Sequence, residues 1–167
     1  MLCLALSLVA LAVLALDQLS KAAVCRQFAD YVAAYTQTGL FSGVRPSEQL
    51  PVLDGVVHIT FQPNTGAAFS IGTGRTWFFI LITFVFFAVV VYALRKKWFR
   101  GLSLWALAMV VGGAVGNLLD RILRGFVVDM IEVEFISFPV FNVADCFICI
   151  GGALLVLAVL TEGKSCS

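Results

Sequence analysis

Four long apolar segments limit what this chain can fold into. They lie at about residues 1–20, 72–94, 102–120 and 142–161. An α-helix rises 1.5 Å per residue, so about 20 apolar residues are needed to cross roughly 30 Å of hydrocarbon. Of the 167 residues, 61% are hydrophobic and only 13% are charged. The sequence therefore predicts an integral membrane protein with four helical spans, forming a single membrane domain over residues 1–167.

The first apolar segment is predicted to be a retained helix. It has no basic region before it and no small-residue cleavage site before Asp17, both of which a secretory signal peptide needs.

The one sizeable region outside the predicted spans covers about residues 22–71. The β-branched run VVHIT at residues 56–60 predicts a short strand, and Pro63 with the small residues after it predicts a turn. Upstream, FADYVAAYTQ at residues 28–37 predicts a helical turn or two. The region is too small for an independent core, so we expect it to pack on the membrane face of the helices. His58 is interpreted as structural.

Charge gives a first orientation for the spans. The basic loop RKKWFR, at residues 95–100, is typical of a loop on the cytoplasmic side. Basic residues also lie near span ends on the opposite side, so charge alone leaves the orientation open; these are Lys21, Arg26, Arg75, Arg121 and Arg124. The net charge of +1 gives no reason to expect a nucleic acid partner.

Unusual polar residues gather at span ends on one predicted membrane face. They are Asp17 with Lys21, the stretch NTGAAFS at residues 64–70, Asn117 with Asp120 and Arg121, Asp129 in the short third loop, and Asn142 with Asp145. Within the helices, spacings of three or four residues put the members of a cluster on one face. An ionised carboxylate in the middle of a membrane span costs about 2.5–3.5 kcal/mol on insertion scales, so such residues indicate function.

Most of these clusters also have a structural explanation. The explanations are ion pairs at helix ends for Asp17–Lys21 and Asp120–Arg121, an N-cap for Asn142, a turn for NTGAAFS, and helix packing for the GxxxG of Gly112 and Gly116. Asp129 and Asp145 are harder to explain in this way. Only 15 residues separate them, which is short enough for the chain to bring them together.

Two carboxylates in a poorly solvated place tend to share one proton. The charged carboxylate can then act as a general base on water, while the protonated one donates to the developing oxyanion, as in aspartic proteases. This chemistry needs no metal and no cofactor, and we expect neither. The CxxC of Cys146 and Cys149 has no second pair or nearby histidine, so both are interpreted as buried thiols.

Two other function classes use intramembrane carboxylates. A small transporter would relay protons through Asp129 and Asp145, but the second span offers only Thr83 as a polar residue near its middle. A different kind of intramembrane aspartyl protease would carry its two aspartates within adjacent spans.

Five sequence blocks together resemble the lipoprotein signal peptidases, also called the signal peptidase II family. The blocks are DQLSK, NTGAAFS, GGAVGNLLDR, VVDMI and FNVAD, at residues 17–21, 64–70, 112–121, 127–131 and 141–145. They occur in the family order and cover nearly the whole chain. The stretch between Lys21 and Asn64 is longer than the resemblance leads us to expect.

The resemblance implies four transmembrane helices with an extracytoplasmic β-cradle and both termini in the cytoplasm. It implies an aspartyl endopeptidase of the bacterial inner membrane, with its active site on the extracytoplasmic side. The implied substrates are diacylglyceryl-modified prolipoproteins, cut immediately before the lipidated cysteine, and we expect a monomer in contact with membrane lipid. The family's catalytic pair falls on Asp129 and Asp145. Its supporting positions match Asp17, Lys21, Asn64, Gly66, Asn117, Asp120, Arg121 and Asn142.

Overall fold

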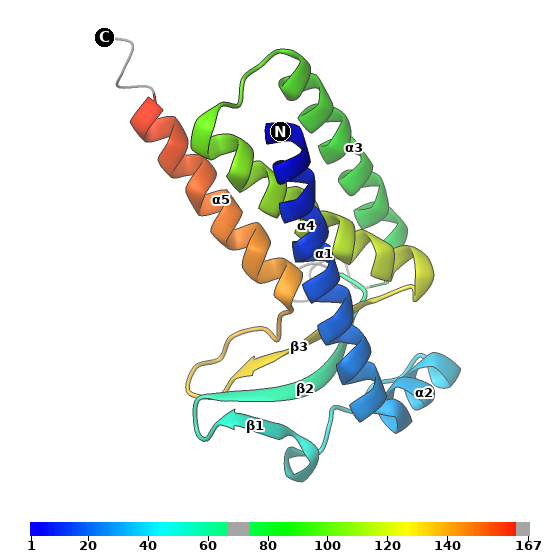
Figure 1. The fold of residues 1–167 in the computed structure, drawn as a ribbon. Helices are drawn as coiled ribbons and strands as arrows, with labels where there is room; N and C mark the ends of the chain where they lie inside the picture. The colour runs from blue at the N-terminus through cyan, green and yellow to red at the C-terminus, as the bar shows by residue number, and fades with distance from the viewer. Residues whose placement is uncertain (67–73, 163–167) are drawn as a thin grey trace. The chain divides into compact units, whose positions relative to one another are not determined.

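The computed structural model describes residues 1–66 and 74–162 (Figure 1). Within these residues, four helices are long and apolar enough to cross a membrane, namely α1 (Leu2–Gln27), α3 (Thr76–Arg95), α4 (Gly101–Leu123) and α5 (Val143–Glu162). The shorter elements are α2 (Ala29–Thr38), η1 (Pro46–Glu48), β1 (Leu50–Leu53), β2 (Val57–Asn64) and β3 (Val127–Val133). The predicted fold class, four membrane helices with a small β element, is confirmed.

The elements differ from the sequence predictions at a few places. Helix α1 continues to Gln27 instead of ending near residue 20. Asp129, expected in a loop, lies inside β3, and Pro63, expected in a turn, lies inside β2. Strand β1 was not predicted. The helical turns expected at residues 28–37 form α2.

The first of two compact units, here called the helical unit, consists of Met1–Asp17, Ile80–Leu118 and Val143–Ser167. Glycines on α4 and α5 mark its closest helix contacts. A Cβ atom added to Gly112 would lie 2.6 Å from the carbonyl oxygen of Ala10 in α1, and one added to Gly113 would lie 2.6 Å from that of Ala144 in α5. Only a hydrogen atom fits at such distances, so these glycines let the helix backbones approach closely.

The second compact unit, here called the sheet unit, consists of Gln18–Phe79 and Leu119–Asn142. Its antiparallel strands stand in the order β1-β2-β3, and β3 pairs with β2 from Asn64 opposite Val127 to Val57 opposite Val133. One buried apolar cluster is formed by residues at or just after the end of α1, in β2, and in or just before β3. Its members are Val24, Phe28, Phe61, Phe126, Val128 and Met130. Burial at the edge of this cluster raises the pKa of the Tyr35 phenol, so Tyr35 stays neutral.

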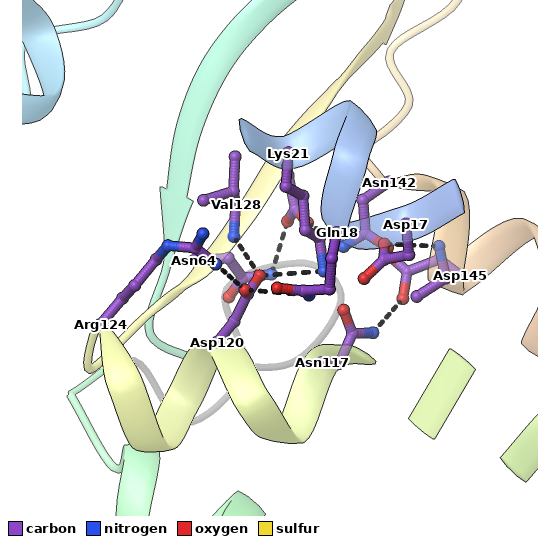
Figure 2. Close-up of polar contacts among 12 residues, drawn as sticks. Asp17, Gln18, Lys21, Asn64, Asn117, Asp120, Arg124, Val128, Asn142 and Asp145 are labelled. Carbon is purple, nitrogen blue, oxygen red and sulfur yellow. Dashed lines mark hydrogen bonds and ion pairs between the residues drawn. The ribbon is translucent and has the colours of Figure 1, made fainter. Parts of the chain in front are cut away.

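A buried ion pair joins two helices within the sheet unit. The Nζ atom of Lys21 in α1 lies 2.9 Å from Oδ2 of Asp120 in α4, and both side chains are fully buried (Figure 2). Removing one member of a buried ion pair is strongly destabilising, so each of these two charges stabilises the other.

The close packing of α5 on α4 gives a first prediction. A Cβ atom at Gly151 would lie 2.7 Å from the Ala106 carbonyl oxygen, whereas one at the neighbouring Gly152 would meet nothing within 4 Å. We expect Gly151→Ala to destabilise the protein by about 1–3 kcal/mol through overpacking. Gly152→Ala should be neutral or stabilise by up to about 1 kcal/mol through helix propensity. Thermal unfolding of both variants in one detergent tests this, and equal shifts in Tm would contradict it.

The buried ion pair gives a second prediction. Asp120→Asn leaves the ammonium group of Lys21 facing a neutral amide, and we expect a loss of about 3–5 kcal/mol in unfolding free energy. The control is Glu48→Gln, which neutralises one side of the solvent-accessible Arg45–Glu48 pair and should lower the Tm much less. A drop in Tm of the same size in both variants would show that the buried Lys21–Asp120 pair contributes no more to stability than the accessible pair does.

Candidate active site

Asp129 is held by two asparagine side chains of the sheet unit. It lies opposite Gln62 in the β2–β3 register and is 2% exposed. Its Oδ2 accepts a hydrogen bond from Nδ2 of Asn64 at 2.9 Å, and its Oδ1 accepts one from Nδ2 of Asn142 at 2.6 Å. Asn64 ends β2 and Asn142 directly precedes α5. Each carboxylate oxygen thus has an amide donor from a segment distant in sequence.

Asn64 is itself held in place through contacts with Gly66. Its Oδ1 accepts a hydrogen bond from the backbone N–H of Gly66 at 2.8 Å, the local turn that asparagine favours. Arg121 donates from Nη2 to the carbonyl oxygen of Gly66 at 3.0 Å, and its guanidinium group lies 5.3 Å from the centre of the Phe79 ring. The remainder of NTGAAFS, residues 67–70, lies outside the described residues.

Asp145 lies in the helical unit, in the first turn of α5, and is half-buried. Its Oδ1 accepts a hydrogen bond from Nδ2 of Asn117 in α4 at 2.8 Å (Figure 2). The preceding residue, Ala144, donates its backbone N–H to Oδ1 of the fully buried Asp17 at 3.0 Å. Asp17 therefore caps α5, where a carboxylate also interacts favourably with the positive end of the helix dipole.

Asp120 contacts the strand that carries Asp129. Its Oδ2 accepts a hydrogen bond from the backbone N–H of Val128 at 3.2 Å, in addition to its ion pair with Lys21. Its Oδ1 pairs with Arg124, one helical turn further along α4, and accepts from Gln18 at 3.4 Å. The Lys21–Asp120 pair thus fixes the backbone next to Asp129.

Arg124, Gln18 and the Val128 amide were not among the predicted site positions. The signal for Arg124 was present, because it stands four residues after Asp120 and therefore on the same helix face. The Val128 amide and Gln18 have no such signal, because their contacts depend on how distant segments meet.

The cysteines are placed differently from the prediction. Cys149 is exposed on α5 and Cys146 is half-buried, so the prediction of two buried thiols is wrong for Cys149. Among residues 1–66 and 74–162, no three His, Cys, Asp or Glu side chains group closely enough to hold a metal ion. His58 lies in β2, with Nδ1 3.6 Å from a carboxylate oxygen of Glu134.

The chain matches known proteins over almost its full length. A family model described as signal peptidase (SPase) II matches residues 9–161. The lipoprotein signal peptidase of Shouchella clausii (strain KSM-K16) is 38% identical over 160 residues, which are 95% of this chain and 94% of that protein. The lipoprotein signal peptidase of Lactococcus lactis subsp. lactis (strain IL1403) is 36% identical over 138 residues, which are 83% of this chain and 87% of that protein.

Two solved structures, each described as a bacterial membrane enzyme, share the fold. One superposes with a TM-score of 0.75 at 29% identity, covering 96% of this chain and 90% of the other. The second gives a TM-score of 0.72 at 31% identity, covering 92% of this chain and 90% of the other. With its four apolar helices, the chain belongs to the signal peptidase II family, the multi-pass bacterial membrane peptidases that cleave the signal peptides of lipoproteins.

Proposed function

We propose that this chain is an aspartic endopeptidase in which Asp129 and Asp145 act together on the scissile peptide bond. The observation that carries the proposal is the way asparagine amides orient both carboxylates: Asn64 and Asn142 on Asp129, and Asn117 on Asp145. An asparagine amide orients a carboxylate without adding charge, and proton transfer stays with the two acids.

The chain connectivity supports a joint role for the two aspartates. Asn142, which donates to Asp129, directly precedes the first residue of α5, and Asp145 follows three positions later. Asp17 and Asn117 hold the first turn of α5 in the helical unit. In the sheet unit, Asn64 and Asp120 hold Asp129 and its strand.

In the proposed reaction, one aspartate is ionised and the other is protonated. The ionised carboxylate takes a proton from water as the water oxygen attacks the peptide carbonyl carbon. The protonated carboxyl group donates to the carbonyl oxygen, which becomes a hydroxyl in the tetrahedral intermediate. Collapse of the intermediate returns that hydroxyl proton to a carboxylate and breaks the C–N bond, and the leaving nitrogen takes a proton from the other carboxyl group.

The proposed substrate is a prolipoprotein that already carries diacylglycerol on its cysteine, cut immediately before that cysteine. The proposed location is the bacterial inner membrane, with Asp129 and Asp145 on the extracytoplasmic side. The basic loop at residues 95–100 supports this orientation, because short basic loops stay in the cytoplasm. Asp129 follows the opposite end of α4, and Asp145 lies at the beginning of α5. We propose that the enzyme acts as a monomer in a single membrane domain.

The proposed dyad gives a third prediction. Asp129→Asn and Asp145→Asn should each lower the cleavage rate by at least about 100-fold, because an amide cannot exchange the required proton. The assay is a gel shift of a lipidated prolipoprotein incubated with the detergent-solubilised variant. The matched control is Asp30→Asn, an exposed aspartate of α2, which should retain the wild-type rate.

Folding must be separated from chemistry in these variants. We expect Asp145→Asn, at a half-exposed position, to keep a Tm close to that of the wild type. A folded variant of either aspartate that turns over at the wild-type rate would remove that residue from the dyad.

The proposed substrate gives a fourth prediction. If the lipid anchor sets the depth of the scissile bond, the same prolipoprotein without diacylglycerol should be cleaved roughly 100-fold more slowly, through loss of positioning. The two forms should be compared at equal concentration in the same detergent. Equal rates would show that the peptide alone positions the bond, whereas loss of cleavage of both forms in the Asp129→Asn variant would still support the dyad.

A further inference from the structure

One end of the sheet exposes large apolar side chains outside all four candidate spans. Val52 and Leu53 end β1 and are 65% and 59% exposed. Phe135, Ile136 and Phe138 follow β3 and are 65%, 49% and 50% exposed. We call these five residues the apolar tip.

The five residues belong to one end of the sheet. Figure 1 shows that β1 and β3 end, and β2 begins, at this end. Leu53 pairs with Val57, and Val57 pairs with Val133 on the other side. The N–H of Glu134 donates to the carbonyl oxygen of Val56 at 3.0 Å, which joins the turn between β1 and β2 to the segment after β3.

The segment after β3 is ordered by its own contacts. Phe141 returns to pair with Ile131, its N–H donating to the Ile131 carbonyl oxygen at 3.1 Å. The rings of Phe138 and Phe141 meet edge to face with centroids 5.7 Å apart. The exposed apolar side chains of Phe135, Ile136 and Phe138 therefore stand on a folded loop.

We propose that the apolar tip inserts into the lipid–water interface of the membrane leaflet in which α5 begins. The argument for lipid is continuity with a membrane span. Val143, the first residue of α5, is only five residues after Phe138. At a maximum of about 3.6 Å per residue, Phe138 lies within roughly 18 Å of the start of that span.

The chemistry of the tip favours a neutral lipid surface. Its charged neighbours are Asp54, in the turn between β1 and β2, and Glu134, both acidic, with His58 beside Glu134. Acidic side chains gain nothing from anionic lipid headgroups, so burial of apolar surface drives the insertion. Phenylalanine and aliphatic side chains are suited to the boundary between headgroups and acyl chains.

The same end of the sheet is poorly suited to strand addition by another protein. Strand β1 is the edge strand, but it has only four residues, contains Pro51, and has an irregular register between Pro51 and Leu53. A short edge with proline and a bulge resists pairing with a new strand. The exposed side chains Val52 and Leu53 therefore fit a bilayer better than a peptide strand.

The test measures the depth of the tip in a bilayer without relying on activity. Phe138→Trp and, as a second position, Ile136→Trp are made in a background with Trp77, Trp98 and Trp105 replaced by Phe. Each protein is reconstituted into phosphatidylcholine nanodiscs, with or without lipid brominated high on the acyl chain. Ser47→Trp, at an exposed polar position between Pro46 and Glu48, is the solvent-accessible reference.

We expect brominated lipid to quench the tip tryptophans at least twofold more than the reference, and aqueous iodide to quench them at least twofold less. Tip tryptophans quenched by iodide and not by brominated lipid would overturn the proposal. Protection from both quenchers would also overturn it, because another protein surface would then cover the tip. None of these outcomes depends on Asp129 or Asp145, so the test of membrane insertion is independent of the test of the proposed reaction.

Discussion

The buried ion pair between Lys21 and Asp120 is the interaction on which the sheet unit depends. It brings the end of α1 against α4, and the same carboxylate accepts the Val128 amide of β3. A buried pair of this kind adds little net stability, because desolvation of both charges offsets their attraction. The pair instead favours one arrangement of the chain, since any packing that separates Lys21 from Asp120 removes an opposite charge from two fully buried groups. The position of β3 next to Asp129 is therefore held by this hydrogen bond to a buried charge as well as by the apolar contacts of Val128 and Met130.

The four membrane helices were predicted from the sequence, for a physical reason. Membrane helices need a minimum apolar length, which is a local property of the chain, and the four spans follow from it. Polar residues at fixed helical spacing within apolar surroundings are equally local signals. Asn64, Asn117 and Asn142, all predicted as supporting positions, each donate to Asp129 or Asp145 in the structure.

The strands were harder to predict because the contacts that stabilise them join residues that lie far apart in the sequence. In VVDMIEV the carboxylate of Asp129 interrupts an apolar run, and it is stabilised in β3 by hydrogen bonds from Asn64 and Asn142, which other segments of the chain supply. All four residues of strand β1 are exposed and one is a proline, so β1 lacks the alternation that marks a strand. Lys21 was predicted to end the first span. In the structure it is buried against Asp120, and α1 continues to Gln27. Likewise, Asp120 pairs with Arg124 one turn away, whereas Arg121, its neighbour in sequence, faces Gly66.

Gly116 lies where the candidate active site has no room for a side chain. A Cβ atom there would collide with Oδ2 of Asp17, the buried carboxylate that caps the first turn of α5 through Ala144. Gly112, one turn earlier, faces the backbone of α1, so the two glycines of this GxxxG have different neighbours. Pressure at position 116 would pass through Asp17 to the turn that carries Asp145. We therefore expect substitutions at positions 116 and 17 to be energetically coupled, so that a residue with no functional group shares a structural constraint with an acid.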